Sequence, residues 1–447
     1  MNELKPYPEY KESPLGPIPA HWKSAEIKRL AEVTLGKMLQ PSAASSTDVE
    51  SPYLYAGMIQ DAGIRENEDL IRSMWASPSE LAVLGLRADD VLVVEGGSVG
   101  RSVHLAVARP GWIFQNSVNR LRPISGLSIG AFLDYLMSML VASGAVEAAC
   151  NKATIMHLTA EKLSRLGVPM PTFIEQVQIA KFLDRETAEI DAFIADQEEL
   201  IGLLAERRAA TISHAVTKGL DPTVAMKDSG VDWLGEIPET WDIRRIKQFV
   251  SVPVTDGPHE TPEMHDEGIP FVSAEAVGSG MLNMEKIRGF ITAEDNAKYS
   301  QKYSPKFDDI YMVKSGATTG VVAIVDIDTP FNIWSPLAAI RCGDGAHARF
   351  VMYALKSFQF QESVRLHWNF GTQQNIGMSV IENLPIAFPP GDQQLSIAVR
   401  LDRETAELDA TIADAKEAIV LSQERRAALI SAAVTGKIDV REHGAVA

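Results

Sequence analysis

The heptapeptide LDRETAE occurs twice in the sequence, at Leu183–Glu189 and at Leu401–Glu407. Closely spaced carboxylates of this kind can serve as a general acid and a general base, so the repeat suggests a duplicated active site. No histidine, nucleophile or glycine-rich loop accompanies either copy, however. The acids and the arginine of the heptapeptide instead have the three- and four-residue spacings of surface pairs on a helix. We therefore interpret LDRETAE as helix surface and not as an active site.

Other catalytic motifs are missing as well. The stretch EGGSVGRS (Glu95–Ser102) looks like a phosphate-binding loop, but its spacing is wrong and Arg101 stands where that motif has lysine. Its counterpart KSGATTG (Lys314–Gly320) also lacks a lysine in the required place. We find no zinc-protease, hydrolase, dinucleotide-binding or adenine-methyltransferase motif, and the nine histidines have no metal-ligand spacing. The sequence therefore predicts a non-catalytic binding protein without a metal site.

Two kinds of segment could contact a ligand. VLVVEGG and IYMVKSG each indicate a strand that runs into a glycine turn, where a backbone can approach a ligand closely, although an ordinary hairpin turn is the simpler interpretation. Polar stretches follow at Gln115–Pro123, Asn151–His157 and His367–Asn375, and each also fits a surface loop. Their Gln, Asn and Arg side chains can read base edges bidentately. The candidate DNA-contacting residues are Gly96, Gly97, Ser98, Arg101, Gln115, Asn116, Asn119, Arg120, Lys152, Lys314, Ser315, Thr318, Thr319, Trp368, Asn369, Thr372, Gln373, Gln374 and Asn375.

Composition limits the choice of partner and compartment. The net charge is −17, whereas non-specific nucleic-acid binders usually carry a basic excess. The chain therefore either does not bind nucleic acid or binds it through local basic patches and with the help of partners. No apolar run is long enough to span a bilayer, no apolar signal-peptide core occurs near the N-terminus, and only Cys150 and Cys342 could form a disulfide. We expect a cytoplasmic protein without a membrane partner or structural disulfides.

The repeat extends well beyond the heptapeptide. A shift of 218 positions aligns Leu183–Asp221 with Leu401–Asp439 without a gap, and 26 of the 39 aligned positions are identical. Unrelated segments would match at roughly 2 of these positions. Weaker similarity continues outside, as between DDVLVVEGG at Asp89–Gly97 and DDIYMVKSG at Asp308–Gly316. We interpret the chain as a tandem duplication, in which each half is a variable globular domain followed by a nearly constant segment.

The constant segments have the composition and periodicity of long helices. Thr172 and Glu175 fit a capping box at the start of the first, and Gly219 and Gly436 fit the two helix ends. A helix of roughly 40 residues with one apolar stripe needs a partner helix, so we predict that the two copies pack antiparallel as a coiled coil. The predicted packing positions are Ile179, Leu183, Ile190, Ile194, Ile201, Ile397, Leu401, Leu408, Ile412 and Ile419.

Taken together, these residues resemble the specificity subunit of type I restriction–modification systems. The resemblance rests on W-L-G-x-I-P-x-x-W at Trp233–Trp241, on the Q-x-x-I stretches that end at Ile179 and Ile397, on LDRETAE and on ERRAALISAAVTGKID. It covers essentially the full length of the chain. The first-half counterpart of the tryptophan motif, LGPIPAHW, lacks the leading tryptophan, so the two constant segments and the second-half motif are its most specific parts.

The resemblance implies an α+β fold with two recognition domains, at residues 1–170 and 222–388, and two conserved helical spacers, at residues 171–221 and 389–447. In that family each domain reads one half of a split DNA target, and an antiparallel coiled coil with pseudo-twofold symmetry fixes the spacer between the halves. The subunit recruits two methyltransferase subunits, which use S-adenosylmethionine to methylate adenine. Complexes with two added motor/nuclease subunits also cleave unmethylated DNA.

The resemblance thus predicts a non-catalytic recognition subunit that binds double-stranded DNA, holds no cofactor of its own and leaves S-adenosylmethionine to its partner methyltransferase. Because the two domains share little sequence, we expect an asymmetric target with two different half-sites. A different hypothesis is a non-catalytic protein-interaction scaffold with a carbohydrate or protein ligand. The acidic composition favours that scaffold slightly, whereas the duplicated helices favour the recognition subunit.

Overall fold

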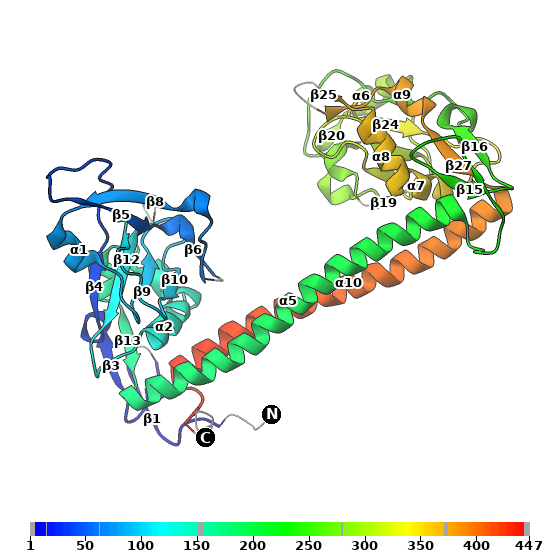
Figure 1. Cartoon of the computed structure of the whole chain (residues 1–447). Coiled ribbons are helices and arrows are strands. Elements are labelled where there is room, and N and C mark those ends of the chain that lie inside the picture. The colour runs from blue at the N-terminus through cyan, green and yellow to red at the C-terminus, as the bar shows by residue number, and fades with distance from the viewer. Residues whose placement is uncertain are drawn as a thin grey trace. The chain divides into compact units, whose positions relative to one another are not determined.

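The computed structural model of the protein describes residues 5–14, 16–61, 63–150, 156–278, 280–370 and 374–441. The chain forms two compact units (Figure 1). The first unit comprises Met1–Gln197 and Glu417–Ala447, and the second comprises Glu198–Lys416. The division runs through two long helices, α5 (Phe173–Lys218) and α10 (Gly391–Val434). Each unit therefore combines a globular α+β part with a portion of both helices.

The first unit is built on a four-stranded antiparallel sheet in the order β10-β9-β12-β4. Strand β9 of this sheet has the sequence VLVV, and its alternate residues enter two different cores: Val91 and Val93 pack into one, Leu92 and Val94 into the other. The sheet is thus covered on both faces. A second sheet, β11-β5-β8, pairs β11 with β5 in parallel and β5 with β8 antiparallel. The strands of this unit are β1 (Tyr10–Lys11), β2 (Ile18–Pro19), β3 (Lys23–Glu26), β4 (Ala31–Leu35), β5 (Val49–Leu54), β6 (Ile59–Gln60), β7 (Gly63–Ile64), β8 (Arg72–Ala76), β9 (Val91–Val94), β10 (Ser102–His104), β11 (Ile113–Phe114), β12 (Val118–Pro123) and β13 (Gly167–Met170), and its short helices are α1 (Pro78–Leu84), α2 (Gly130–Ala142), α3 (Ala145–Ala149) and α4 (Ala160–Ser164).

The second unit repeats this plan. Its main sheet has the order β17-β24-β21-β22-β19, in which the first four strands take the places of β4, β12, β9 and β10, and β19 is added at the edge. The sheet β23-β18-β20 again contains one parallel and one antiparallel pair. The strands are β14 (Met226–Asp228), β15 (Glu236–Pro238), β16 (Asp242–Arg245), β17 (Thr255–Asp256), β18 (Ile269–Val272), β19 (Gly280–Met281), β20 (Gly289–Ile291), β21 (Ile310–Val313), β22 (Val322–Ile324), β23 (Asn332–Ile333), β24 (Leu337–Ile340), β25 (Asn369–Phe370), β26 (Gln374–Asn375) and β27 (Pro385–Phe388), and the short helices are α6 (Ala293–Ser300), α7 (Ala348–Lys356), α8 (Phe358–Leu366) and α9 (Met378–Asn383).

The ends of the long helices follow the sequence signals. Glu175 N donates a hydrogen bond to Thr172 Oγ1 at 3.3 Å, and Glu175 Oε2 in return accepts a hydrogen bond from Thr172 N at 3.1 Å, so the predicted capping box is present. Gly219 and Gly436, with φ of 80° and 72°, follow the ends of α5 and α10 in the left-handed conformation that glycine adopts without strain. The predicted helix ends are therefore confirmed.

Within each unit, α5 and α10 run antiparallel. In the first unit, Arg426 of α10 lies 2.8 Å from Asp191 of α5, while Leu183, nearer the start of α5, shares a core with Ile430. In the second unit, Arg208 lies 2.9 Å from Asp409. The same core of that unit holds Ile212 and Val216 of α5 with Ile397 and Leu401 of α10.

The predicted apolar stripe divides into two environments. Residues near the start of each long helix enter the core of a globular part, and those farther along are half-buried. Ile179, Leu183, Ile397 and Leu401 belong to domain cores; Ile190 is also buried; Ile194, Ile201, Leu408, Ile412 and Ile419 are half-buried. The stripe therefore fastens each helix to its globular part as well as to the other helix.

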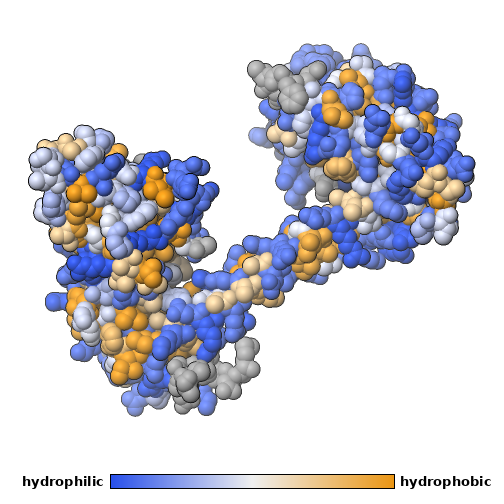
Figure 2. Space-filling view, in the orientation of Figure 1, coloured by the Kyte–Doolittle hydropathy of each residue, from blue (hydrophilic) through white to orange (hydrophobic). Residues whose placement is uncertain are grey.

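The surface of the chain is mainly hydrophilic on the face seen in Figure 2, with apolar residues in small separate groups, some of them over the long helices. Phe193 and Leu203 of α5 and Val420 and Leu421 of α10 are among the exposed large apolar side chains. None of the helices in the described residues combines the length and apolar character needed to cross a membrane.

Candidate nucleic-acid interface

In the first unit, the candidate turn joins β9 to β10 as a hairpin. Gly97 and Gly100 both have φ of 83°, a conformation that a residue with a side chain adopts only with strain. Gly100 N donates to Val94 O at 2.9 Å, and a Cβ on Gly100 would lie 2.8 Å from Val141 Cγ2. Gly97 and Ser98 are exposed at the tip. The turn is thus a close-packed hairpin with a solvent-facing tip, as the simpler interpretation predicted; DNA contact by this tip stays a prediction.

The second unit has the equivalent turn between β21 and β22. Gly316 and Gly320 have φ of 110° and 96°, and Gly320 N donates to Val313 O at 2.7 Å. Thr318 is exposed, but Thr319 is 8% exposed and its hydroxyl donates to Gly316 O at 2.7 Å. The predicted DNA contact by Thr319 is therefore corrected: its side chain stabilises the turn from inside.

Each turn is bridged to a polar segment that lies far away in the sequence. In the first unit, Gly96 forms an isolated antiparallel bridge with His157, and Leu158 N donates to Glu95 O at 2.9 Å. In the second unit, Ser315 forms the same bridge with Asn375. Two further backbone hydrogen bonds close that bridge: Gly316 N donates to Gln374 O at 3.1 Å and Ile376 N donates to Lys314 O at 2.9 Å. The structure thus brings together turn and polar segment, which the sequence had identified separately.

Two predicted base contacts in the first unit are wrong. Asn119 and Arg120 on β12 are 0% and 2% exposed. Asn119 Nδ2 donates to Leu158 O at 2.8 Å, and Arg120 Nη1 donates to Val83 O at 2.8 Å. Burial lowers the pKa of Arg120 to about 10. Successive side chains on β12 point to opposite faces of the sheet, and both faces are covered, so both side chains lie inside the protein, where they form internal hydrogen bonds and cannot reach a base edge.

The remaining candidates differ in accessibility. Gln115 and Asn116 are half-buried, and Gln115 Oε1 accepts a hydrogen bond from Ser117 Oγ at 2.7 Å. Arg101 lies 2.8 Å from Asp61, which is itself exposed. Trp368 packs half-buried against the core of the second unit, and Gln374 is exposed. Lys152, Thr372 and Gln373, together with the side chain of Asn369, lie outside the described residues.

Lys314 belongs to a group that the sequence did not reveal. Its Nζ lies 3.2 Å from Oδ2 of Asp256, a side chain with no exposed surface. Lys302 and His259 contact the same carboxylate. Aspartate followed by glycine and proline at Asp256–Pro258 is a turn signal, but nothing local indicates that two distant lysines converge on it.

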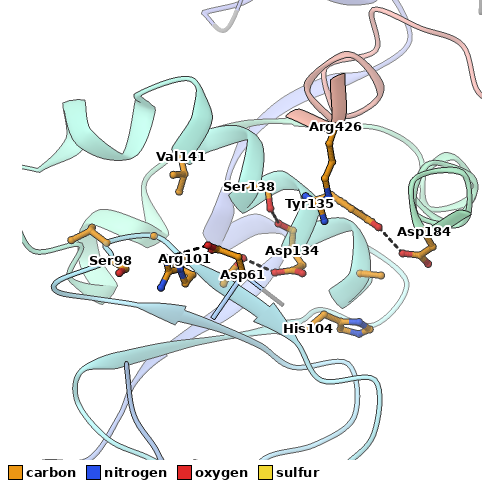
Figure 3. A pocket seen from close by; sticks show the side chains of 14 residues that line it. Asp61, Ser98, Arg101, His104, Asp134, Tyr135, Ser138, Val141, Asp184 and Arg426 are labelled. Atoms are coloured by element: carbon orange, nitrogen blue, oxygen red, sulfur yellow. Dashed lines mark hydrogen bonds and ion pairs between the residues drawn. The ribbon is translucent and has the colours of Figure 1, made fainter. Parts of the chain in front are cut away.

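In the first unit, the duplicated heptapeptide contacts the globular part. Tyr135 on α2 donates to Asp184 Oδ1 at 2.8 Å (Figure 3). Its hydroxyl also lies 3.2 Å from Thr187 Oγ1. Tyr135 and Asp184 border a cavity of about 590 Å³, which is also lined by Arg426 and Asp134. Burial raises the pKa of Asp134, whose carboxylate accepts a 2.5 Å hydrogen bond from Ser102.

The second unit repeats the contact at the other copy of the heptapeptide. Tyr353 on α7 donates to Asp402 Oδ1 at 2.8 Å and lies 3.2 Å from Thr405 Oγ1. The interpretation of LDRETAE as helix surface is therefore incomplete. Its aspartate and threonine join the long helix to a domain helix, whereas Glu186 keeps a surface contact of 3.0 Å with Arg185.

Comparison with known proteins matches most of the chain to a single family. Residues 19–200 and 238–419 each match the family described as type I restriction modification DNA specificity domain. The MjaVIII type I restriction enzyme specificity subunit of Methanocaldococcus jannaschii is 22% identical over 391 residues, which cover 86% of each chain. The EcoBI specificity subunit of Escherichia coli is 27% identical over 202 residues, covering 44% of this chain and 42% of that subunit.

Solved structures share the fold. A chain from a study of complex assembly and conformational transition in a type I restriction–modification system superposes with a TM-score of 0.66 at 16% identity, covering 94% of this chain and 99% of the other. The HsdS subunit of Thermoanaerobacter tengcongensis superposes with a TM-score of 0.50 at 15% identity, covering 96% and 100%. With two matched domains joined to long helices, the chain belongs to the type I restriction–modification specificity subunit family.

Proposed function

We propose that this chain is the DNA-recognition subunit of a type I restriction–modification complex and that each globular part reads one half of an asymmetric, bipartite target. The chain itself is non-catalytic in this proposal and works in the cytoplasm. The proposal rests on membership of the specificity subunit family and on one observation about the two units. They have the same framework around the turn and its bridged segment, but different side chains on it.

The differences fall on positions fixed by equivalent backbone contacts. Glu95 and Lys314 follow the equivalent strands β9 and β21. His157 and Asn375 are the bridge partners of the two turns. Gln115 N donates to Leu54 O at 2.8 Å, and Trp334 N donates to Val272 O at 2.9 Å, so these residues also correspond. The first unit thus has an acid where the second has a lysine, and an amide where the second has a tryptophan. These side chains present different chemistry to a base pair, which supports two different half-sites.

The contacts that attach the globular parts to the helices, by contrast, are kept. Trp22 Nε1 donates to Glu175 Oε1 at 3.1 Å, and Trp241 Nε1 donates to Gln393 Oε1 at 2.8 Å. If the helices of a duplicated subunit set the spacer between two DNA half-sites, its globular parts must be attached to the helices in the same way, while their DNA-reading surfaces are free to differ. This pattern supports the proposal that α5 and α10 form a coiled coil and that the chain arose by tandem duplication, with pseudo-twofold symmetry.

We further propose that the chain recruits two methyltransferase subunits, which supply S-adenosylmethionine chemistry, and two motor/nuclease subunits where the system includes them. The net charge of −17 supports a role for partners, because a strongly acidic chain binds the DNA backbone weakly by itself. In this arrangement the methyltransferases provide much of the phosphate clamp, and this chain provides sequence readout.

Methylome sequencing tests the function directly. Deletion of the gene from its source cell is expected to remove one bipartite N6-methyladenine motif, and complementation is expected to restore it. Co-purification adds a second readout, since a methyltransferase with bound S-adenosylmethionine is expected to accompany the tagged chain. An unchanged methylome together with a lone chain that has no DNA preference would contradict the proposal and favour the protein-interaction scaffold.

A further inference from the structure

A group of charged side chains surrounds a buried carboxylate in the second unit. Asp256 ends β17, and its side chain has no exposed surface. Lys302 Nζ contacts Asp256 Oδ1 and donates to Gly257 O at 3.2 Å. Oδ2 lies 3.2 Å from Lys314 Nζ and 3.1 Å from His259 Nε2. We name Asp256, His259, Lys302 and Lys314 the Asp256 cluster.

The cluster carries more positive than negative charge. Two lysines face one carboxylate, so one positive charge remains even when His259 is neutral. Burial by itself raises the pKa of Asp256, but hydrogen bonds from Lys302 and Lys314 outweigh it and hold the pKa below its ordinary value. The carboxylate is therefore ionised at neutral pH and anchors both lysines. Side-chain exposure is 47% for Lys302 and 70% for His259, so the excess charge faces solvent.

The loop that carries Asp256 and His259 packs closely against β23. A Cβ on Gly257 would lie 1.9 Å from Ile333 O, so only glycine allows the loop to approach β23 this closely. Further along the loop, Glu260 O accepts a hydrogen bond from Trp334 Nε1 at 3.1 Å. The guanidinium of Arg288 lies 4.4 Å from the centre of the Trp334 ring. Cations and an aromatic side chain thus lie around this closely packed loop, next to the candidate turn that begins at Lys314.

The first unit has no such cluster at the equivalent place. Asp256 pairs with Ala338 on β24, and Leu35 pairs with Asn119 on β12, so Leu35 takes the position of Asp256. Glu95 takes the position of Lys314. The nearby Lys37 is committed to Glu80, and its side chain is only 12% exposed. Among the described residues, this position of the sheet therefore carries such a cluster in the second unit and not in the first.

We infer that the Asp256 cluster binds a DNA backbone phosphate beside the half-site that the second unit reads, with Lys302 and His259 at the phosphate and Asp256 as the positioning residue. This inference rests on the proposed function. A lysine already held by an ion pair loses less conformational freedom when it meets the phosphate than a mobile one does. Because a phosphate contact carries no sequence information, the cluster sets register and affinity and leaves sequence selection to other residues.

The test measures DNA affinity of the complete complex with its methyltransferase subunits as a function of KCl concentration. Two duplexes are used, one with the methylated motif of the source cell and one without it. Lys302→Gln is expected to weaken binding to both duplexes by a similar factor and to reduce the slope of log K against log[KCl] by about 0.9, the value for one phosphate contact. Lys302→Arg, which keeps the charge, is expected to retain most of that slope.

Matched variants separate a positioning role from damage to the fold. Lys227→Gln removes one positive charge on β14, from a residue outside the cluster, and is expected to leave the slope unchanged. Asp256→Asn is expected to lower affinity for both duplexes like Lys302→Gln while the complex stays assembled. If that variant fails to assemble, Lys302→Gln and Lys302→Arg, at a partly exposed position, decide the question.

The outcomes are distinguishable. An unchanged slope in Lys302→Gln, in a complex that binds and methylates its motif, overturns the phosphate site and leaves the proposed function intact. A loss confined to the motif-containing duplex assigns the cluster to base readout and also overturns the inference. Failure of the unmodified complex to bind either duplex overturns the proposed function and the inference with it.

Discussion

The hydroxyl of Tyr135 donates a 2.8 Å hydrogen bond to Asp184, and through it the domain helix α2 is fastened to the long helix α5. The second unit fastens α7 in the same way, through Tyr353 and Asp402. The heptapeptide LDRETAE supplies the acceptor in both units. Its repetition therefore reflects a repeated attachment between a globular part and a helix, not a repeated reaction.

Removal of this hydroxyl is expected to weaken the attachment without changing the DNA motif. Tyr135→Phe loses the bond to Asp184 and the contact with Thr187, so the free energy of unfolding of the first unit should fall by about 1 kcal/mol. Urea unfolding measures the loss and methylome sequencing measures the motif. Glu186→Gln is the control, because its surface ion pair contributes less than about 0.5 kcal/mol. Equal effects of the two substitutions would contradict the assignment.

Asn119→Ala is expected to affect stability and not specificity. The substitution leaves the buried Leu158 carbonyl without the 2.8 Å hydrogen bond from Asn119, at a cost of roughly 1–3 kcal/mol. The chemical-denaturation midpoint should fall, while the methylated motif of the surviving complex stays the same. Gln115→Ala, at a half-buried position, is the comparison. A less specific methylated motif in an Asn119→Ala variant of unchanged stability would support a base contact by Asn119 after all.

Acid should destabilise the first unit through Glu175. Burial works to raise the pKa of this group, but hydrogen bonds from His21, Thr172 and Trp22 outweigh it and hold the pKa below its ordinary value. A carboxyl group with a depressed pKa stabilises the fold above its unfolded pKa of about 4.3, and this contribution disappears as pH falls through the lower folded value. The second unit has Gln393 in this place.

Glu175→Gln should therefore flatten the dependence of stability on pH below about 4.5. The measurement is the urea midpoint of the first unit at a series of pH values, for the natural chain and the variant. Glu189→Gln, at an exposed position of α5, changes the net charge equally and should keep the natural pH profile. Parallel profiles for the natural chain and Glu175→Gln would show that Glu175 does not carry the effect.

Lengthening both long helices should widen the DNA target. Seven residues inserted into α5 after Gln197 and seven into α10 after Lys416 add roughly 10.5 Å, at 1.5 Å per residue. This length corresponds to about three base pairs at 3.4 Å each. Nearly two whole turns preserve the apolar stripe, so methylome sequencing should find unchanged half-sites with a wider gap. Insertion into one helix only should abolish methylation, and an unchanged gap after the double insertion would refute the spacer role.

Local signals in the sequence predicted the helical part of this structure well. The capping box at Thr172 and Glu175 and the glycines at the helix ends act over a few residues, so their effect can be read from the residues themselves. The strands before the glycine turns could be predicted for the same reason, because VLVV and IYMV are short apolar runs that end in glycine.

The surface available to DNA was harder to predict, because it depends on distant partners. Asn119 has the side chain of a base reader, but its hydrogen bond to Leu158 turns it inward. The Asp256 cluster is the opposite case. Nothing in the sequence near Asp256 indicates a binding site, and only the fold brings Lys302, which follows α6, and Lys314, which follows β21, to this carboxylate. Residue type identifies what a side chain can bind, and the fold decides whether it is free to do so.

The order of the chain segments that form the two units has a consequence for protein synthesis. The second unit is one continuous stretch of chain, so all of its residues have left the ribosome once Lys416 has been added and the exit tunnel cleared. The core of the first unit, in contrast, includes Ile430, Val434 and Val440, and Asp439 N donates to Lys5 O at 2.7 Å. The half of the molecule that is translated first is therefore completed last, because its apolar core can close only after the final turns of α10 have been synthesised.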